Sequence, residues 1–266
     1  MFDKIGAGAG GTSHVTKRLT HNRKAAFEQV SRALIILTYD EIEGSEALWS
    51  SLPLSSFDEV LVVDGGSSDG TVEFYQKHGV KVVGQDTPGR GEAFRVGVKN
   101  TRSSILVFYS PDGNEAPSDI VKLCERLENN EADIAIASRF MKDSRNEEDD
   151  QFFRFRAWVN RAFTFIANIL FNKGQPYITD TINGFRAVRR CSFEVLNLDE
   201  CGFPIEYQMS IRAMKNKLRI VEIPTIEGNR LGGKSKCLSL PVGWGHVKVL
   251  SYEIWASFKE WLGHIF

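Results

Sequence analysis

Polar residues that follow short apolar runs are the first candidates for chemistry in this chain of 266 residues. Asp64 ends one such run, and a Gly-rich stretch containing Gly66 and Ser67 comes directly after it. A carboxylate in this position can accept hydrogen bonds from a ribose or a base, and glycines let the backbone approach a nucleotide closely. The alternative is an ordinary strand-to-helix turn in which Asp69 caps the next helix.

A second candidate site follows the apolar run Ile105–Tyr109. Asp112 and Asn114 supply oxygen ligands on a short turn, and such ligands suit Mg²⁺ or Mn²⁺. An ion held there could bridge a diphosphate and neutralise charge on a leaving group. A plain Asp-Gly-Asn turn is the alternative. Arg90, between two glycines, could reach a phosphate, although this signal alone is weak.

The elements that would position these residues alternate between short apolar runs and helical patterns. This predicts an α/β fold with a mostly parallel sheet and helices on both faces, so the residues after each strand should meet at one edge. The expected strands are Ala33–Thr38, Glu59–Val63, Val80–Val83, Ile105–Tyr109 and Ile134–Ser138. The expected helices are Glu46–Ser51, Gly70–Lys77, Gly91–Asn100, Ser118–Asn129 with Ser118 as N-cap, Gln151–Phe171, and Ile205–Lys215 bracketed by Asp180–Val188 and Leu218–Ile223.

Six short motifs occur in one order along the chain. They are Thr38-Tyr39-Asp40-Glu41, Val63–Thr71, Gly89–Gly97, Ser138-Arg139-Phe140, Asp180–Arg186, and Arg230 with Gly233-Lys234-Ser235-Lys236. Together they resemble glycosyltransferase family 2 in its dolichyl-phosphate mannose synthase-like, polyprenyl-phosphate branch. The resemblance covers about Ala33 to Lys236 and implies the GT-A (Rossmann-like) fold.

The resemblance also implies an activity and a set of site residues. The activity is inverting transfer of a sugar from a UDP- or GDP-linked donor to a polyprenyl phosphate, aided by Mg²⁺ or Mn²⁺. The implied donor-binding or phosphate-binding residues are Thr38, Tyr39, Glu41, Asp64, Gly66, Ser67, Arg90, Arg161, Arg230, Ser235 and Lys236. The implied catalytic residues are Asp112, Arg139, Arg186 and Glu206, and the implied metal ligands are Asp112 and Asn114. For the basic residues, surface solvation is the alternative.

Two departures from the family pattern bear on the donor. Ser110 stands where the family has the first Asp of Asp-x-Asp, and Gly65 replaces the second Asp of Val-Asp-Asp. Three functions therefore stay open: transfer to a lipid phosphate, transfer to a hydroxyl with Glu206 as base, and binding of a nucleotide sugar without catalysis. The competing role of Glu206 is that of an acidic residue at a helix start.

Composition limits the partners. Apolar residues make up 42% and charged residues 25%, as in ordinary globular proteins, and a formal net charge of −1 gives no general affinity for nucleic acid. The four cysteines form no CxxC pair, which argues against a zinc site or a disulfide framework and favours a reducing cytosol.

Membrane contact is expected at the surface only. No signal-peptide pattern opens the chain, and no apolar run reaches the roughly 18–20 residues that span a bilayer. The longest candidate, Phe152–Phe171, is interrupted by Arg154, Arg156 and Arg161. A cytoplasmic protein is expected, soluble or peripheral on the inner face of the cell membrane. The aromatic residues of Val247–Phe266 suit an interfacial helix, with core packing or a homo-oligomer contact as the alternative.

The expected organisation has three parts. Residues 1–31 form an extension with a helix around Arg23–Arg32, residues 32–240 the catalytic domain, and residues 241–266 the C-terminal amphipathic helix. Gly6–Gly11 imitates a dinucleotide fingerprint, but no strand precedes it, so we interpret it as a flexible leader.

Overall fold

The computed structural model describes residues 30–146, 149, 155–232 and 239–263. The chain divides into two units, Met1–Val30 and Ser31–Phe266, and every element described belongs to the second. The helix expected around Arg23–Arg32 and the glycines Gly6–Gly11 lie outside the described residues, except that Arg32 begins the first strand.

One sheet organises the described part of the chain, with the strand order β3-β2-β1-β4-β6-β5-β7. The pairs are parallel except those of β6, which runs antiparallel to β4 and β5. The strands are β1 (Arg32–Thr38), β2 (Glu59–Asp64), β3 (Lys81–Gly84), β4 (Ile105–Tyr109), β5 (Ile134–Ser138), β6 (Arg186–Arg189) and β7 (Ile220–Pro224). The five strands expected from apolar runs are confirmed, each to within one residue at its ends.

Helices cover both faces of the sheet, as the alternating pattern predicted. Side chains of α3 and α5 pack on one face, and those of α4, α7 and α8 pack on the other. The helices are α2 (Ile42–Leu48), α3 (Thr71–Lys77), α4 (Arg90–Lys99), α5 (Asp119–Glu128), α6 (Phe155–Phe171), α7 (Arg190–Leu196), α8 (Ile205–Lys215) and α9 (Ser239–Gly263), with short 3₁₀ helices at Trp49–Ser51 and Leu54–Ser56.

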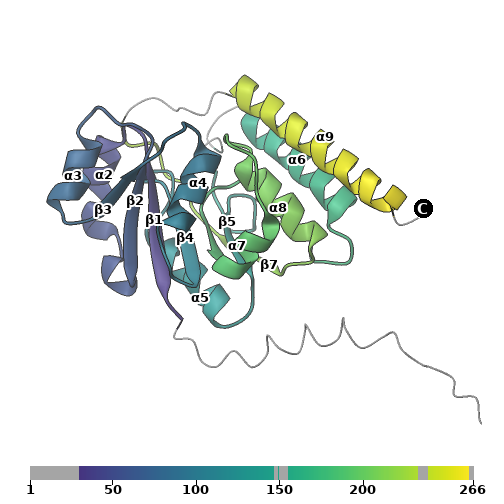
Figure 1. Ribbon diagram of the computed structural model, residues 1–266, viewed down its shortest axis with the longest axis horizontal. Coiled ribbons are helices and arrows are strands. Elements are labelled where there is room, and N and C mark those ends of the chain that lie inside the picture. Colours follow the sequence, from purple (N-terminus) through teal and green to yellow (C-terminus); the bar gives the residue numbers. More distant parts are fainter. Residues whose placement is uncertain (1–29, 147–148, 150–154, 233–238, 264–266) are drawn as a thin grey trace, which may run out of the picture. The chain divides into compact units, whose positions relative to one another are not determined.

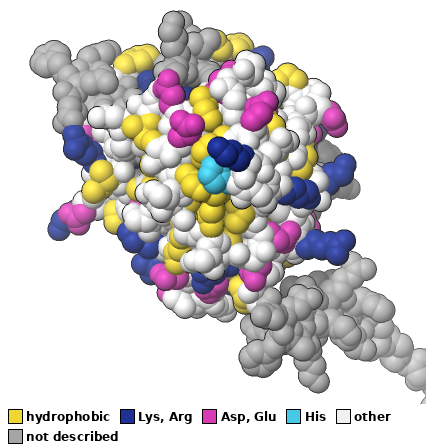
Figure 2. Space-filling model, turned by 90° about the vertical axis from the view of Figure 1, so that its left-hand side faces the viewer, with side chains coloured by type: hydrophobic (Ala, Val, Ile, Leu, Met, Phe, Trp, Pro, Cys, Tyr) yellow, Lys and Arg dark blue, Asp and Glu magenta, His cyan; other side chains and the backbone are white. Residues whose placement is uncertain are grey.

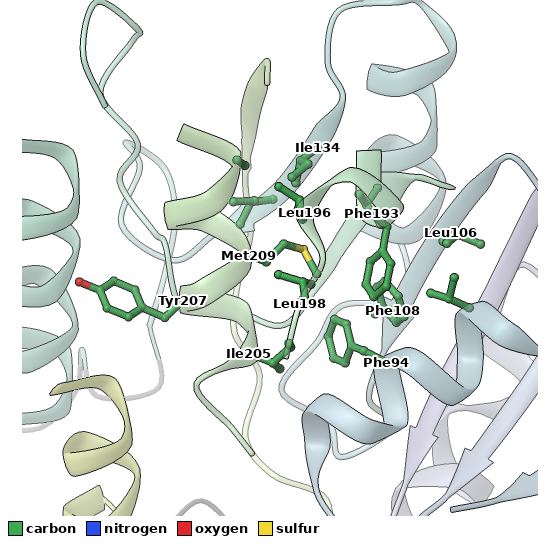
Figure 3. Close-up of a cluster of buried hydrophobic side chains, with 14 of the residues drawn as sticks. Phe94, Leu106, Phe108, Ile134, Phe193, Leu196, Leu198, Ile205, Tyr207 and Met209 are labelled. Atoms are coloured by element: carbon green, nitrogen blue, oxygen red, sulfur yellow. The ribbon is translucent and has the colours of Figure 1, made fainter. Parts of the chain in front are cut away.

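Helix α8 connects the sheet to two outer helices. On the sheet side, the ring of Phe94 stacks on Phe108 with centroids 4.0 Å apart, within a cluster that includes Met209 of α8 (Figure 3). On its other side, Tyr207 points away from this cluster and donates a hydrogen bond of 2.9 Å to the carbonyl of Phe163 in α6. The same ring contacts His246 of α9. Helices α6 and α9 lie side by side beyond α8 (Figure 1).

Two helices differ from the sequence prediction. Helix α2 begins at Ile42 and not at Glu46, because Asp69, from the loop after β2, accepts a 3.0 Å hydrogen bond from the Ile42 N–H. A cap supplied from so far along the chain leaves no local signal. Helix α7 was not expected; it follows β6 directly, and Arg190 anchors its start on the carbonyls of Val98 and Ser103.

The surface shows two further features. Among the described residues, no helix combines the length and the apolarity needed to cross a bilayer. At the end of the molecule that carries α2 and α3, acidic and basic side chains are interspersed among apolar ones (Figure 2). That face therefore presents no basic patch for a polyanion.

Candidate active site

A cavity of about 520 Å³ opens at the carboxyl ends of β1, β2 and β4. Helices α6, α8 and α9 and the loop before Leu231 supply its other walls. Nine of the predicted site residues line it: Thr38, Tyr39, Glu41, Arg90, Asp112, Asn114, Arg139, Glu206 and Arg230. The structure brings these nine residues together at one cavity.

Asp64 holds the loop after β2 in shape but does not line the cavity. The Asp64 carboxylate accepts hydrogen bonds from the N–H groups of Gly66 and Ser67, both at 2.8 Å, and from the hydroxyl of Thr38 at 2.9 Å. Because Asp64 is 3% exposed and its carboxylate is engaged within the protein, it holds the turn in place. Gly65 lines the cavity, whereas Asp64, Gly66 and Ser67, expected to contact the nucleotide, do not.

The candidate metal turn offers one engaged and one open oxygen ligand. One oxygen of Asp112 accepts the Asn114 N–H at 3.1 Å, and the other accepts a 2.9 Å hydrogen bond from Arg230. The Oδ1 atom of Asn114 is buried and has no hydrogen-bond partner. A buried acceptor without a donor, beside a carboxylate, fits a divalent cation. Among the described residues, no group of three His, Cys, Asp or Glu side chains is placed to hold a metal ion.

Ser110, in place of the usual carboxylate, binds an arginine. Its hydroxyl accepts a 3.1 Å hydrogen bond from Arg90, and its N–H donates at 2.7 Å to Glu115. Glu115 lines the cavity, and burial raises the pKa of its carboxyl to about 8, with Asp112 adding to the effect. Sequence reasoning missed Glu115, which belongs to none of the six motifs.

Arg90 also forms an ion pair with Glu206, whose side chain is almost completely buried. Gly184 leaves room for this pair, because a Cβ atom there would lie 2.1 Å from Nη2 of Arg90. Burial would lower the pKa of Arg90, but Glu206 and Glu115 raise it above its ordinary value. The glycine of the Asp180–Arg186 motif is therefore explained by the arginine across the cavity.

The two arginines of the later motifs separate in space. Arg139 lines the cavity and is held by Asp180, with its Nε atom 2.7 Å from a carboxylate oxygen, while Glu227 lies 3.6 Å away. Arg186, predicted to be catalytic, is fully buried outside the cavity lining and donates to the carbonyls of Asn183 and Glu206. Burial lowers its pKa to about 10. Arg186 thus positions the loop before it and the start of α8.

Arg230 bridges two acidic residues that line the cavity. Its guanidinium pairs with Asp112 and with Glu41, while its Nε atom is buried and has no hydrogen-bond partner. Arg161 lies outside the cavity lining, with its guanidinium 4.8 Å from the centre of the Phe140 ring. Ser235 and Lys236 fall outside the described residues.

The outer helices contribute lining that sequence reasoning also missed. Phe155, Arg156, Val159 and Asn160 come from α6, and Val242, Gly243 and His246 come from α9. His246 is 4% exposed, its Nε2 atom is buried without a hydrogen-bond partner, and burial lowers its pKa. Helical spacing alone does not distinguish such a residue from an ordinary core histidine.

Comparisons with known proteins show the family of the chain. The model of glycosyl transferase family 2 matches residues 33–196. Glycosyltransferase AglJ of Haloferax volcanii is 33% identical, covering 71% of this chain and 60% of that protein. A dolichol-phosphate mannosyltransferase of Pyrococcus furiosus is 32% identical, covering 77% of this chain and 58% of that protein. An undecaprenyl-phosphate mannosyltransferase of Micrococcus luteus is 28% identical, covering 86% and 98%. The chain spans less than two thirds of the length of the first two relatives.

A solved structure confirms the GT-A fold. Glucosyl-3-phosphoglycerate synthase from Mycobacterium tuberculosis, in complex with Mn²⁺, UDP and glucosyl-3-phosphoglycerate, superposes with a TM-score of 0.67 at 18% identity, covering 94% of this chain and 86% of that chain. Since the family model matches more than half of the chain and AglJ is 33% identical over 71% of it, the chain belongs to glycosyl transferase family 2.

Proposed function

We propose that the protein transfers a sugar from a UDP- or GDP-linked donor to the phosphate of a polyprenyl phosphate, at the inner face of the cell membrane. The observation that carries this proposal is the convergence of Arg90, Arg139 and Arg230 with the Asp112–Asn114 turn on one cavity. Guanidinium groups bind phosphate oxygens in pairs, so these arginines suit phosphorylated substrates once the substrates replace their carboxylate partners. The relatives named for dolichol phosphate and undecaprenyl phosphate support this acceptor class.

The donor would lie along the ends of β1, β2 and β4. Tyr39, Glu41 and Gly65 border that part of the cavity, where the glycine adds no side chain. Arg230, which pairs with Asp112, would bind the diphosphate. Asp112 and Asn114 would hold Mg²⁺ or Mn²⁺, which neutralises charge on the leaving nucleoside diphosphate when bound.

The reaction balances without a protein base. An oxygen of the acceptor phosphate attacks the anomeric carbon of the sugar from the face opposite the diphosphate. The new carbon–oxygen bond forms as the bond to the diphosphate breaks, and its electron pair leaves with the nucleoside diphosphate. The configuration at the carbon is inverted. Because the acceptor is already an anion, no proton has to be removed from it, and Arg139 would orient it.

A hydroxyl acceptor is the second candidate, because Glu206 lines the cavity and could take a proton. Its carboxylate is, however, bound to Arg90 and would have to leave this ion pair before it could take a proton from a hydroxyl. This arrangement supports the phosphate acceptor. The substitution Glu206→Gln should leave an acceptor-phosphate reaction measurable and should abolish transfer to a hydroxyl.

Incubation of the full chain with undecaprenyl phosphate, manganese and radiolabelled UDP- or GDP-sugars tests the proposal. Label that moves into the organic phase is the expected result. Label on a water-soluble acceptor would replace the acceptor proposed here. Binding of a donor without any transfer would overturn the catalytic proposal.

A further inference from the structure

Exposed large apolar side chains gather on helices α6 and α9. Within the described residues, six of them lie on α6 and seven on α9, against six elsewhere. The α6–α9 surface is represented by Trp158, Phe165, Ile169, Trp255, Phe258 and Trp261, each more than half exposed. Four of the five tryptophans of the chain lie on these two helices, which pack against each other (Figure 1). A large apolar patch of this kind indicates a binding surface.

The charges around this surface are mainly positive. Helix α6 contains no acidic residue, and Arg161 is exposed on it. Lys248 and Lys259 are exposed on α9, and the ammonium of Lys259 lies 3.9 Å from the centre of the Trp255 ring. Glu253 is buried against Arg212 and Lys215, which leaves Glu260 as the exposed acid among the described residues of α9. Tryptophan beside lysine and arginine is typical of helices at a lipid–water interface.

The same two helices form a wall of the active-site cavity. Val159 and Asn160 line it from α6, and Val242 and His246 line it from α9. A ligand with its charged end in the cavity could therefore place an apolar tail on the exposed faces of α6 and α9, because the same two helices line the cavity. A phosphate joined to a long hydrocarbon chain has this division of polar and apolar parts.

We propose that the α6–α9 surface binds the interface of a bilayer containing anionic lipids, so that the acceptor phosphate enters the cavity while its hydrocarbon chain stays in the lipid. The identity of the acceptor in this inference rests on the proposed function; the binding of the surface to lipid does not. Binding strength of such surfaces increases with buried apolar area and with attraction to anionic headgroups.

A second copy of the chain is a poorer occupant. In a twofold-symmetric dimer the same patch faces itself, which would bring Arg161, Lys248 and Lys259 of both copies to one interface. Like charges at an interface are unfavourable, whereas an anionic bilayer supplies the opposite charge. The measured mass of the protein in solution therefore belongs in the test.

Flotation of the full chain with vesicles provides that test, without donor or polyprenyl phosphate. With phosphatidylcholine vesicles that contain phosphatidylglycerol, the protein should float, and its tryptophan emission should shift to shorter wavelength as the rings leave water. Floating should decrease with pure phosphatidylcholine and with added salt. Protein that stays in solution with both kinds of vesicle would overturn the inference.

The double substitution Trp255→Ser and Trp261→Ser should weaken partitioning by about tenfold or more, since it removes two large apolar groups from the contact. The double substitution Tyr177→Ser and Val195→Ser is the matched control, because both residues are exposed but lie outside α6 and α9. Thermal unfolding shows whether each variant is folded. An equal loss of vesicle binding in both double variants would contradict the role proposed for the α6–α9 surface. A wild-type dimer that becomes monomeric only in the tryptophan variant would identify a second copy of the chain as the occupant of this surface.

The two proposals fail separately in this design. A protein that floats but labels no polyprenyl phosphate would overturn the proposed function and leave the lipid surface standing. A protein that labels short, water-soluble polyprenyl phosphates but binds no vesicle would do the reverse.

Discussion

Both carboxylate oxygens of Asp112 accept hydrogen bonds at the edge of the sheet. One of its oxygens holds its own turn, and the other is bound by Arg230. When a divalent cation and a diphosphate are present, both charged groups have new partners, since the cation would take the carboxylate and the phosphate oxygens would take the guanidinium. The arginine thus keeps a partly buried carboxylate paired when the donor is absent.

The substitution Asp112→Asn should reduce kcat/KM for transfer by about 10³-fold, because a cation at a leaving diphosphate contributes several kcal/mol to the transition state. Manganese binding, followed by calorimetric titration with UDP present, should weaken in parallel. Glu125→Gln, at an exposed position of α5, is the matched control and should change neither quantity. Full activity in the Asp112 variant would remove this residue from the metal site.

Gly184 permits the contact between Arg90 and Glu206. In Gly184→Ala the new methyl group would lie 2.1 Å from Nη2 of Arg90 and 2.8 Å from Oε1 of Glu206, so the ion pair must move. Because both obstructing atoms end flexible side chains, we expect a folded protein whose kcat/KM falls by about 10²-fold, as misplaced binding groups do. Steady-state kinetics and thermal unfolding measure the two effects.

Gly84→Ala is the control for that substitution, since no atom lies within 4 Å of a Cβ built at Gly84. Wild-type kinetics in Gly184→Ala would show that the Arg90–Glu206 pair is not needed for transfer. An unfolded Gly184 variant would contradict the expectation that side-chain ends alone are displaced.

At the scale of elements, a loop from far along the chain packs on the Asp112–Asn114 turn. The N–H of Leu231 donates to the Asp112 carbonyl at 2.7 Å, and the N–H of Gly228 donates to the Asn114 carbonyl at 3.1 Å. A Cβ on Gly113 would lie 2.7 Å from the Asn229 carbonyl, so the loop packs directly on this glycine. These two backbone hydrogen bonds and the close packing on Gly113 therefore fix where Arg230 stands.

Apolar runs and motif order predicted the strands and nine cavity residues, because strand burial and strand ends leave local signals. Arg139 and Arg186 both belong to motifs, but their places differ. Arg139 lines the cavity, whereas Arg186 is fully buried outside its lining. Their difference comes from the antiparallel placement of β6 between β4 and β5, which residue spacing does not encode. His246 reaches the cavity only through the packing of α9, whereas Glu115 is held there by the N–H of Ser110 in its own loop.

His246 should make the packing of α9 depend on pH. Burial lowers its pKa below the ordinary value of about 6.5, although Glu206 and Glu200 act in the opposite direction. Below that value the unfolded chain binds a proton that the native protein does not, so the free energy of unfolding should decrease as pH falls towards the lowered pKa. Above it, this residue should contribute no pH dependence.

Urea unfolding at about pH 7.5 and about pH 5.5 measures this effect. In His246→Gln the difference in unfolding free energy between the two conditions should be smaller than in the wild type. His78 is exposed at the end of α3, so His78→Gln is the control. This variant should retain the wild-type difference in unfolding free energy between the two pH values. An unchanged pH dependence in the His246 variant would mean that this imidazole is not kept neutral by burial.

At the scale of the whole molecule, the cavity is where separate regions of the chain meet. Strands β1 and β4 bring Thr38 and Ser110 to it, α8 brings Glu206, and the loop after β7 brings Arg230. A ligand that binds this junction contacts elements from most of the unit Ser31–Phe266. It should therefore stabilise the fold as a whole, because it binds the native state and not the unfolded chain.

Thermal unfolding with UDP or GDP and manganese should therefore identify the donor class. At a concentration of about 100 times Kd, the matching nucleotide should add about 2.7 kcal/mol, which for a chain of this size raises Tm by roughly 5–10 °C. A chelator should remove most of this shift, and Asp112→Asn should show only the part that does not depend on the metal. The arginines should still bind phosphate oxygens in that variant, so a small residual shift is expected. If neither nucleotide raised Tm in the wild type, the junction of strand ends would not be a nucleotide site.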